Sequence, residues 1–168
     1  RLVTLLLGMG AFAGAAFLVL ESREHAKARG GRVYARLGPV SSGRARRARG
    51  ELGERISAML DAADLPSGDL LAVSGASGGH AATAAEMAAL EARPGLAARG
   101  FATLTGHLKE AQFPFAVALA ALAVANGAPY PAFDAAFERP YEGVPQDVLA
   151  TAIGYHQFEG MALVSAAG

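Results

Sequence analysis

A long apolar run extends from Phe113 to Val124. Apolar residues occupy every face of a helical wheel here, so the run predicts a helix that is buried on nearly all sides. Proline is tolerated in the first turn of a helix, where its missing N–H would have no partner, and Pro114 therefore places the helix start close to Gln112. Asn126-Gly127 predicts a left-handed stop at the other end.

Segments with strand-like and helix-like periodicity alternate through the rest of the chain. The pattern predicts strands at residues 32–37, 69–73, 101–105, 148–153 and 161–164, and helices at residues 21–29, 51–63 and 81–92. Residues 40–50 and the proline-rich residues 128–145 are predicted to be connections. Strands that alternate with helices and close in a hairpin predict an α/β fold with a mixed sheet.

The opening stretch from Leu2 to Leu20 carries no charged residue. Its length would suit a membrane-spanning helix, which needs about 20 apolar residues. Several glycines interrupt it, however, and the AFLVLES segment at its end has the aromatic and β-branched content of a buried strand. The residues alone leave both interpretations open.

Composition limits the classes of function. The chain has 168 residues, of which 52% are hydrophobic and 18% charged, which predicts a globular domain. Its formal net charge is zero, so it lacks the basic character of a nucleic-acid-binding domain. The one basic cluster, formed by Arg44, Arg46, Arg47 and Arg49, is interpreted as a solvated connection or as a contact for a phosphate or carrier protein.

Cysteine is absent from the sequence. This excludes disulfides, thiolate metal sites and a cysteine nucleophile within these residues. The first residue is Arg1 and not methionine, which is consistent with a fragment or a processed product.

A glycine-rich segment from Ser74 to Gly79 lies between a predicted strand and a predicted helix. Backbone N–H groups in such a segment can hold an anion. The spacing matches neither a dinucleotide fingerprint nor a P-loop, and no lysine is present, so a phosphate site is the weaker interpretation.

Four motifs resemble the C-terminal portion of a β-ketoacyl-acyl-carrier-protein synthase, a thiolase-fold condensing enzyme. They extend over nearly the whole chain: GAFAGAA with LVLESREHAKARG and RVYARL, then LDAADLPSGDLLAV, then TGHLKEAQFPFAVALAALAVANGAPYP, and finally GYHQFEGMALV. The resemblance implies a thiolase-like α/β fold whose C-terminal half has a mixed five-stranded sheet covered by helices. It assigns residues 1–40 to the last strands and helix of the N-terminal half and residues 41–168 to the C-terminal half. It also makes the apolar opening an internal strand and the protein cytoplasmic.

The family's catalytic groups are only partly retained. The resemblance implies a cysteine nucleophile upstream of Arg1, two histidines that assist decarboxylation of a malonyl unit, and a lysine ahead of the second histidine. Ser74 stands at the first histidine, Ala102 at the lysine, and His107 at the second histidine. His80 lies a few residues too late to replace the first histidine without disrupting the match.

The final hairpin departs from the family as well. Tyr155 stands at a gating phenylalanine, and His156 and Gln157 stand at two glycines beside the acyl pocket. The resemblance therefore implies Thr105, Tyr155 and His156 as acyl-pocket positions. His156 is either an ordinary loop residue or a plug that narrows the pocket, and His107 is either a surviving catalytic imidazole or a histidine kept for packing and hydrogen bonding.

Three hypotheses for function follow. The first is a non-catalytic subunit of the chain-length-factor type that pairs with an active ketosynthase in fatty-acid, polyketide or polyene synthesis. Its expected partners are an active ketosynthase or a second copy, its own N-terminal half and an acyl carrier protein, without nucleic acid, membrane, cofactor or metal. The second hypothesis is an active acyltransferase with atypical residues, and the third is a small domain anchored in a membrane by residues 2–20.

Overall fold

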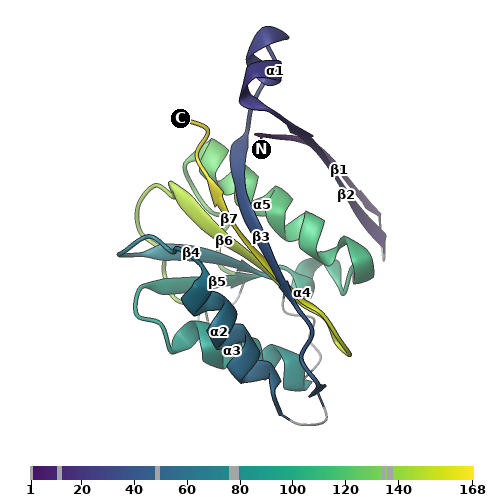
Figure 1. Cartoon of the computed structure of the whole chain (residues 1–168), viewed down its shortest axis with the longest axis vertical. Coiled ribbons are helices and arrows are strands. Elements are labelled where there is room, and N and C mark those ends of the chain that lie inside the picture. The colour runs from purple at the N-terminus through teal and green to yellow at the C-terminus, as the bar shows by residue number, and fades with distance from the viewer. Residues whose placement is uncertain (1, 11–12, 48–49, 76–79, 134, 136–137) are drawn as a thin grey trace.

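The computed structural model describes residues 2–10, 13–47, 50–75, 80–133, 135 and 138–168, with side chains from residue 14 onward. In chain order the elements are β1 (Leu2–Gly10), β2 (Ala13–Glu21), α1 (Arg23–Ala28), β3 (Ala35–Gly43), α2 (Leu52–Ala62), β4 (Leu70–Ser74), α3 (His80–Glu91), β5 (Leu96–Gly100), α4 (Ala102–Thr105), the 3-10 turn η2 (Lys109–Ala111), α5 (Gln112–Asn126), β6 (Asp147–Ile153) and β7 (Glu159–Ser165). The strands form one seven-stranded sheet in the order β2-β1-β3-β7-β6-β4-β5 (Figure 1).

Five strands, in the order β3-β7-β6-β4-β5, make the central part of the sheet. β7 is antiparallel to both of its neighbours, whereas β4 is parallel to β5 and to β6. The predicted mixed five-stranded α/β sheet is therefore confirmed, including the hairpin of β6 and β7.

The sheet separates two hydrophobic cores. Along β4, Leu71 and Val73 point to the core that contains α5, and Leu70 and Ala72 point to the core beneath α2 and α3. Every residue of β4 is buried, as expected for a parallel strand with helices on both faces. The central sheet is thus the middle layer of three, with α5 on one face and α2 and α3 on the other (Figure 1).

The predicted buried helix is confirmed as α5, which begins at Gln112 and ends at Asn126. Pro114 lies in its first turn, where its missing N–H leaves no intrahelical bond unmade. Gly127 follows in the left-handed conformation, with φ of 67°, and ends the helix as expected. Alanines along the helix, among them Ala116 and Ala120, are fully buried and let the backbone approach the sheet closely.

Two predicted strand boundaries are wrong. Residues 102–105 form α4 and not a strand, because the strand that pairs with β4 is the preceding segment, Leu96–Gly100. β3 continues to Gly43 instead of ending at Pro39, so the first part of the predicted connection is strand. The sheet accommodates Pro39, which has no N–H to donate, by a register shift between Leu37 and Val40.

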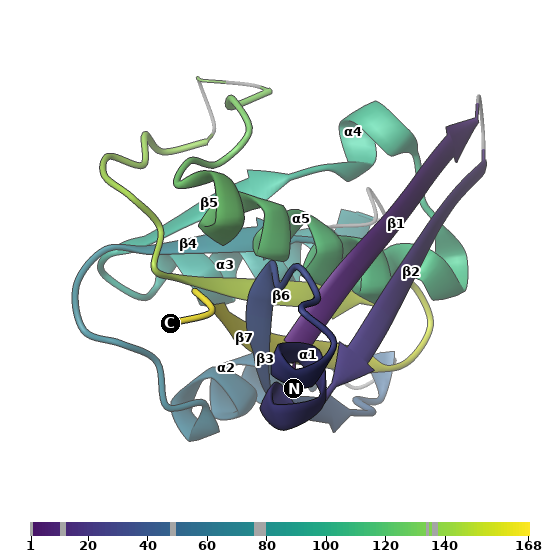
Figure 2. The same cartoon turned by 90° about the horizontal axis from the view of Figure 1, so that it is seen from above.

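The apolar opening of the chain forms a β-hairpin. β1 and β2 pair antiparallel along their whole length, and β1 joins the central sheet only through Leu2–Arg36 and Val3–Ala35. The hairpin therefore diverges from the sheet and lies over α5, as Figure 2 shows from above. The strand interpretation is confirmed, but the expectation of one buried, internal strand is wrong: the stretch forms two strands, and β2 is the outermost strand of the sheet, with Phe17 and Val19 exposed. Among the described residues no helix is long and apolar enough to cross a bilayer. The predicted division after residue 40 falls within β3 and remains a prediction.

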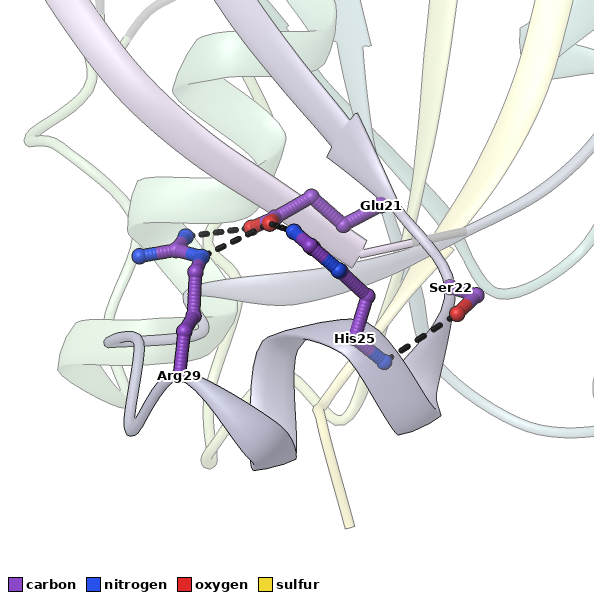
Figure 3. A network of polar contacts seen from close by, with 4 residues as sticks. All are labelled: Glu21, Ser22, His25 and Arg29. Carbon is purple, nitrogen blue, oxygen red and sulfur yellow. Dashed lines mark hydrogen bonds and ion pairs between the residues drawn. The ribbon is translucent and has the colours of Figure 1, made fainter.

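A network of polar contacts stabilises the connection between β2 and α1 (Figure 3). The hydroxyl of Ser22 caps α1 by accepting a hydrogen bond of 3.2 Å from the backbone N–H of His25. Arg29 donates to both carboxylate oxygens of Glu21, with Nε 2.7 Å from Oε1, and His25 Nε2 lies 3.4 Å from the same oxygen. The hydrogen bond from Arg29 lowers the pKa of Glu21. His25 is exposed, as predicted for a surface helix.

The proline-rich loop between α5 and β6 covers the edge strand β5. The hydroxyl of Tyr130 donates to the carbonyl of Arg99, and Glu138 Oε1 accepts from the N–H of Gly100 at 2.8 Å. These bonds occupy polar groups that an uncovered edge strand would offer to another chain. Burial raises the pKa of Tyr130.

The outer face of β2 has no such cover among the described residues. Ala16 and Leu18 pack toward α5, whereas the alternate residues Phe17 and Val19 are 63% and 45% exposed.

We expect the 168-residue chain alone to associate through this apolar face, and Phe17→Lys combined with Val19→Lys to reduce that association. Light scattering and binding of a hydrophobic dye measure it. Val144→Lys, at an exposed valine in the proline-rich loop, is the control. A dye-negative monomer of the unmodified chain would contradict the prediction.

Candidate functional site

A pocket of about 590 Å³ lies between the start of α5 and the turn that joins β6 and β7. We call it the hairpin pocket. Its wall includes Val40 and Ser42 of β3, His107, Phe113 of α5, and residues from Ala152 to Gly160. The pocket lies at the end of β6, which pairs with β4. The chain that leaves β4 returns as β5 on the opposite side of β4 from β6, so the strand order reverses here. Such a reversal of strand order is a common place for ligand sites in α/β sheets.

His107 reaches this pocket from the segment between α4 and α5. Gly106, with φ of 68°, ends α4, and His107 follows as an exposed residue and not as part of the buried helix. Its Nδ1 accepts a hydrogen bond of 2.9 Å from the backbone N–H of Lys109. In the neutral imidazole the proton is then on Nε2, which can donate a hydrogen bond.

The turn from Gly154 to Phe158 forms the opposite wall. The rings of Tyr155 and His156 meet edge to face with centroids 4.4 Å apart. Gly154 is required here, because a Cβ atom would lie 2.1 Å from the carbonyl oxygen of Gln157. Nearby, Gly160 faces the ring of Phe113, which would be 3.6 Å from a Cβ at that position.

Three of the predicted site residues line the same pocket: His107, Tyr155 and His156. Thr105 does not line it, and its hydroxyl instead bonds to the carbonyls of Phe101 and Gly106. His80 is exposed at the start of α3 and is absent from the wall of the hairpin pocket. Residues 76–79 of the predicted glycine-rich anion loop lie outside the described residues.

Ser74, which the resemblance places at the family's first histidine, lies in a different place from His107. It is fully buried at the end of β4 and borders a smaller pocket of about 310 Å³ between α3 and β5. Glu86 of α3 is also fully buried and accepts a hydrogen bond from the hydroxyl of Thr151. Burial raises the pKa of Glu86 to about 7, although hydrogen bonds from Thr151 and Ser74 oppose the shift.

Gln112 connects the segment beside His107 with the segment after Ser74. Its buried side chain accepts a 2.8 Å bond from the N–H of Leu108 and donates a 2.9 Å bond to the carbonyl of Gly75. Gly75 in turn donates to the carbonyl of Thr151 in β6. The chain beside His107 and the chain after Ser74 are therefore held in fixed relation by one amide.

The arginine cluster is only partly solvated. Arg47 forms an ion pair with Glu159, with Nη1 2.5 Å from Oε1, so the interpretation of the whole cluster as a solvated connection is wrong at this residue. Arg44 lies over the ring of Phe158 at 5.5 Å, and Arg49 lies outside the described residues. No group of three or more potential metal ligands occurs in the part of the chain that the structure describes.

Comparison with known proteins decides the fold. No family model and no curated protein matches the sequence. The solved structure of the ishigamide ketosynthase/chain length factor matches 92% of this chain and 43% of its own, with a TM-score of 0.71 and 21% identity. The chain has a ketosynthase fold. The predicted thiolase-like resemblance is confirmed at that level.

Other ketosynthases match in the same way. Ketosynthase twelve of the bacillaene polyketide synthase from Bacillus amyloliquefaciens has a TM-score of 0.65 and 16% identity over 91% of this chain and 34% of its own. A type II PKS acyl-carrier protein in complex with its ketosynthase bound to the hexaketide has a TM-score of 0.60 and 14% identity over 91% and 39%. The ketosynthase-like chain thus spans less than half the length of these three structures.

Two buried carboxylates were missed in the sequence, and periodicity could have found both. Glu86 shares a helical face with Ala82, Ala89 and Leu90, at spacings of three or four residues. Glu159 shares a strand face with Met161, two residues on. A charged residue on an otherwise apolar face indicates a buried polar contact. The sequence around Gln112 gives no comparable indication of the two hydrogen bonds that its side chain makes.

The raised pKa of Glu86 predicts a pH-dependent stability. The folded state holds the proton more tightly than the unfolded state, whose pKa is near the ordinary value of 4.5. The stabilisation is therefore complete below about pH 4.5 and is lost as the pH rises through about 7, by at most about 3 kcal/mol. Denaturant unfolding across this range should show the slope, and Glu86→Gln should flatten it.

Glu91→Gln is the control, since Glu91 is exposed at the end of the same helix. It should leave the slope of the unmodified chain in place. Equal slopes for Glu86→Gln and the unmodified chain would contradict the assignment.

Proposed function

We propose that the chain is part of a non-catalytic ketosynthase-like subunit of the chain-length-factor type, which pairs with an active ketosynthase in fatty-acid or polyketide synthesis. One observation carries the proposal. Three positions correspond to the family's catalytic groups in the resemblance, and of these only His107 lines the hairpin pocket. Ser74 is buried at a separate pocket, and Ala102 has only a methyl group as its side chain.

The remaining chemistry is insufficient for decarboxylative condensation. His107 can still donate one hydrogen bond from Nε2 to a developing oxyanion. The second imidazole and the ammonium that would share this work are replaced by groups that cannot carry a positive charge. Catalytic groups that act as a unit each cost orders of magnitude in rate when they are removed.

The hairpin pocket supports a role in shaping a substrate. Phe113, Ile153 and Phe158 give it an apolar wall that suits an acyl chain, and the Tyr155–His156 pair stands at its rim. The bulk of His156 supports the interpretation of a plug over that of an ordinary loop residue, because it occupies pocket wall where the family has glycine. The pocket would then limit how far a chain can extend.

The proposed partners follow from the same role. They are an active ketosynthase or a second copy, the N-terminal half of the same fold, which would cover the exposed face of β2, and an acyl carrier protein. The matched structures support this choice, since one is described as a ketosynthase/chain length factor and another as a carrier protein in complex with its ketosynthase. A cytoplasmic location is part of the proposal.

An active acyltransferase is the second candidate, and one observation favours it. His107 and His156 line the same pocket, so two imidazoles are present even though neither Ser74 nor His80 supplies the second. His156 lies on the turn and not at the end of β4, which makes it a different arrangement from that of the family.

Co-expression of the full-length protein with an active ketosynthase that copurifies with it tests the proposal. We expect His107→Ala to leave the product yield within about twofold, whereas loss of a catalytic acid or base typically costs about 100-fold or more. Phe113→Ala should shift the product toward longer chains, because it removes a ring from the pocket wall. The measurement is the product distribution by mass spectrometry.

Val144→Ala serves as the control, because Val144 is exposed and does not line the hairpin pocket. It should change neither yield nor chain length. Loss of product in His107→Ala would instead support the active acyltransferase. An unchanged distribution in Phe113→Ala would count against the shaping role.

A further inference from the structure

We propose that Arg47 and Glu159 are positioning residues that act as one buried ion pair and fix the turn of residues 154–158 over the hairpin pocket. The effect on ligand entry rests on the proposed function, whereas the effect on the turn does not. The start of β7 carries a buried charge, that of Glu159.

Glu159 has a fully buried side chain. Its Oε1 lies 2.5 Å from Nη1 of Arg47, and its Oε2 accepts a 3.0 Å hydrogen bond from the backbone N–H of Ala45. Both carboxylate oxygens are thus occupied by the segment that follows β3. A buried carboxylate without such partners would be strongly unfavourable. The burial of Glu159 therefore depends on this segment lying beside it.

Arg47 also holds the other end of the turn. Its Nη2 donates a 2.7 Å hydrogen bond to the carbonyl of Gly154, and Nη1 contacts the carbonyl of Ala45 at 3.3 Å. One guanidinium therefore joins the last residue before Tyr155 and the first residue after Phe158. The planar, forked geometry of arginine allows this double contact, which a lysine ammonium could not reproduce.

The turn itself has little else to hold it. Its own backbone bond runs from the N–H of Gly154 to the carbonyl of Phe158 at 2.9 Å. Phe158 has φ of 66°, an unfavourable conformation for a residue with a side chain. Tyr155 and Phe158 are 58% and 63% exposed, so burial contributes little to their placement. An external anchor is required to keep this conformation.

The segment after β3 is shaped to reach the anchor. A Cβ atom at Gly43 would lie 3.1 Å from Oε2 of the buried Glu159 and 2.5 Å from Nε of the exposed Arg55, so glycine favours the close passage of the chain beside this carboxylate. Ala45 is buried within the second core and fixes the next residues. Arg44 adds a cation–π contact to the ring of Phe158.

Four variants of the full-length protein test the proposal: Arg47→Met, Glu159→Met, the double variant, and Arg55→Met as the control. Arg55 is an exposed arginine beside Gly43 that donates to the carbonyl of Ser42, so it controls for the loss of a nearby positive charge without loss of the bond to Gly154. Hydrogen exchange measures the order of residues 154–158, and the thermal midpoint measures global stability.

We expect each single variant to raise exchange in the turn by about tenfold or more, with amides of β4 and α5 less affected. The thermal midpoint should fall in each single variant, because one charge is left buried without its partner. In the double variant the midpoint should recover, since no charge remains unpaired, while the turn stays in fast exchange. A pair that serves stability alone would restore both properties together.

The proposal is overturned if Arg47→Met leaves exchange in the turn within about twofold, or if Arg55→Met raises it equally. It is also overturned if the double variant restores slow exchange. When a single variant does not fold, the double variant still decides, because its behaviour in the turn is predicted separately from its stability.

Binding of a dansyl-labelled medium-chain fatty acid connects the anchor with ligand entry. We expect its Kd to rise about tenfold in the double variant and to be unchanged in Arg55→Met. If the unmodified protein does not bind the fatty acid while exchange responds as described, the anchor is supported and the proposed function is contradicted.

Discussion

The structure depends on the need to bury a helix that is apolar on every face. α5 can meet this need only if other elements cover it from several sides, because its buried positions extend from Gln112 to Val124. The central sheet covers one side, and the β1–β2 hairpin, which leaves the sheet after two residue pairs, covers another. Small alanine side chains along the helix let both approach closely.

This arrangement also determines where the chemistry can lie. The start of α5 meets the ends of β4 and β6, and Gln112 links the chain beside His107 to the chain after Ser74. These two segments are therefore held in a fixed relation. Ser74 bonds to the buried Glu86 and borders the smaller pocket between α3 and β5, whereas His107 lines the hairpin pocket.

Polar side chains anchor two of the connections between elements. Glu159 and Arg47 tie the segment after β3 to the turn that carries Tyr155 and His156. Glu138 and Tyr130 tie the proline-rich loop to β5. Each contact satisfies polar groups that would be costly to bury without a partner.

Periodicity was sufficient for the elements whose residues determine them locally. The bounds of α5 follow from an apolar run with a proline at one end and Asn126-Gly127 at the other, and the β6–β7 hairpin follows from two apolar runs around a turn. β5 could not be predicted in this way, because Leu96–Gly100 is a strand through its pairing with β4 and not through its own composition. The same holds for β3 beyond Pro39.

The site was predictable to a similar extent. The match to family motifs identified His107, Tyr155 and His156, which do line one pocket. It could not show that Ser74 faces Glu86, nor that Arg47 is paired, because both contacts join residues far apart in the chain. Such pairs leave only an indirect trace in the sequence, as a charge on an apolar face.

Release of carbon dioxide from a malonyl-carrier protein distinguishes a non-catalytic subunit from an active synthase. The measurement is a single-turnover assay on the full-length protein, with the nucleophile of any active partner blocked. If the chain is non-catalytic, as proposed, no release above the rate without protein is expected, because His107 alone cannot replace a group of residues that acts as a unit. Measurable release that is lost in His107→Ala would contradict this proposal.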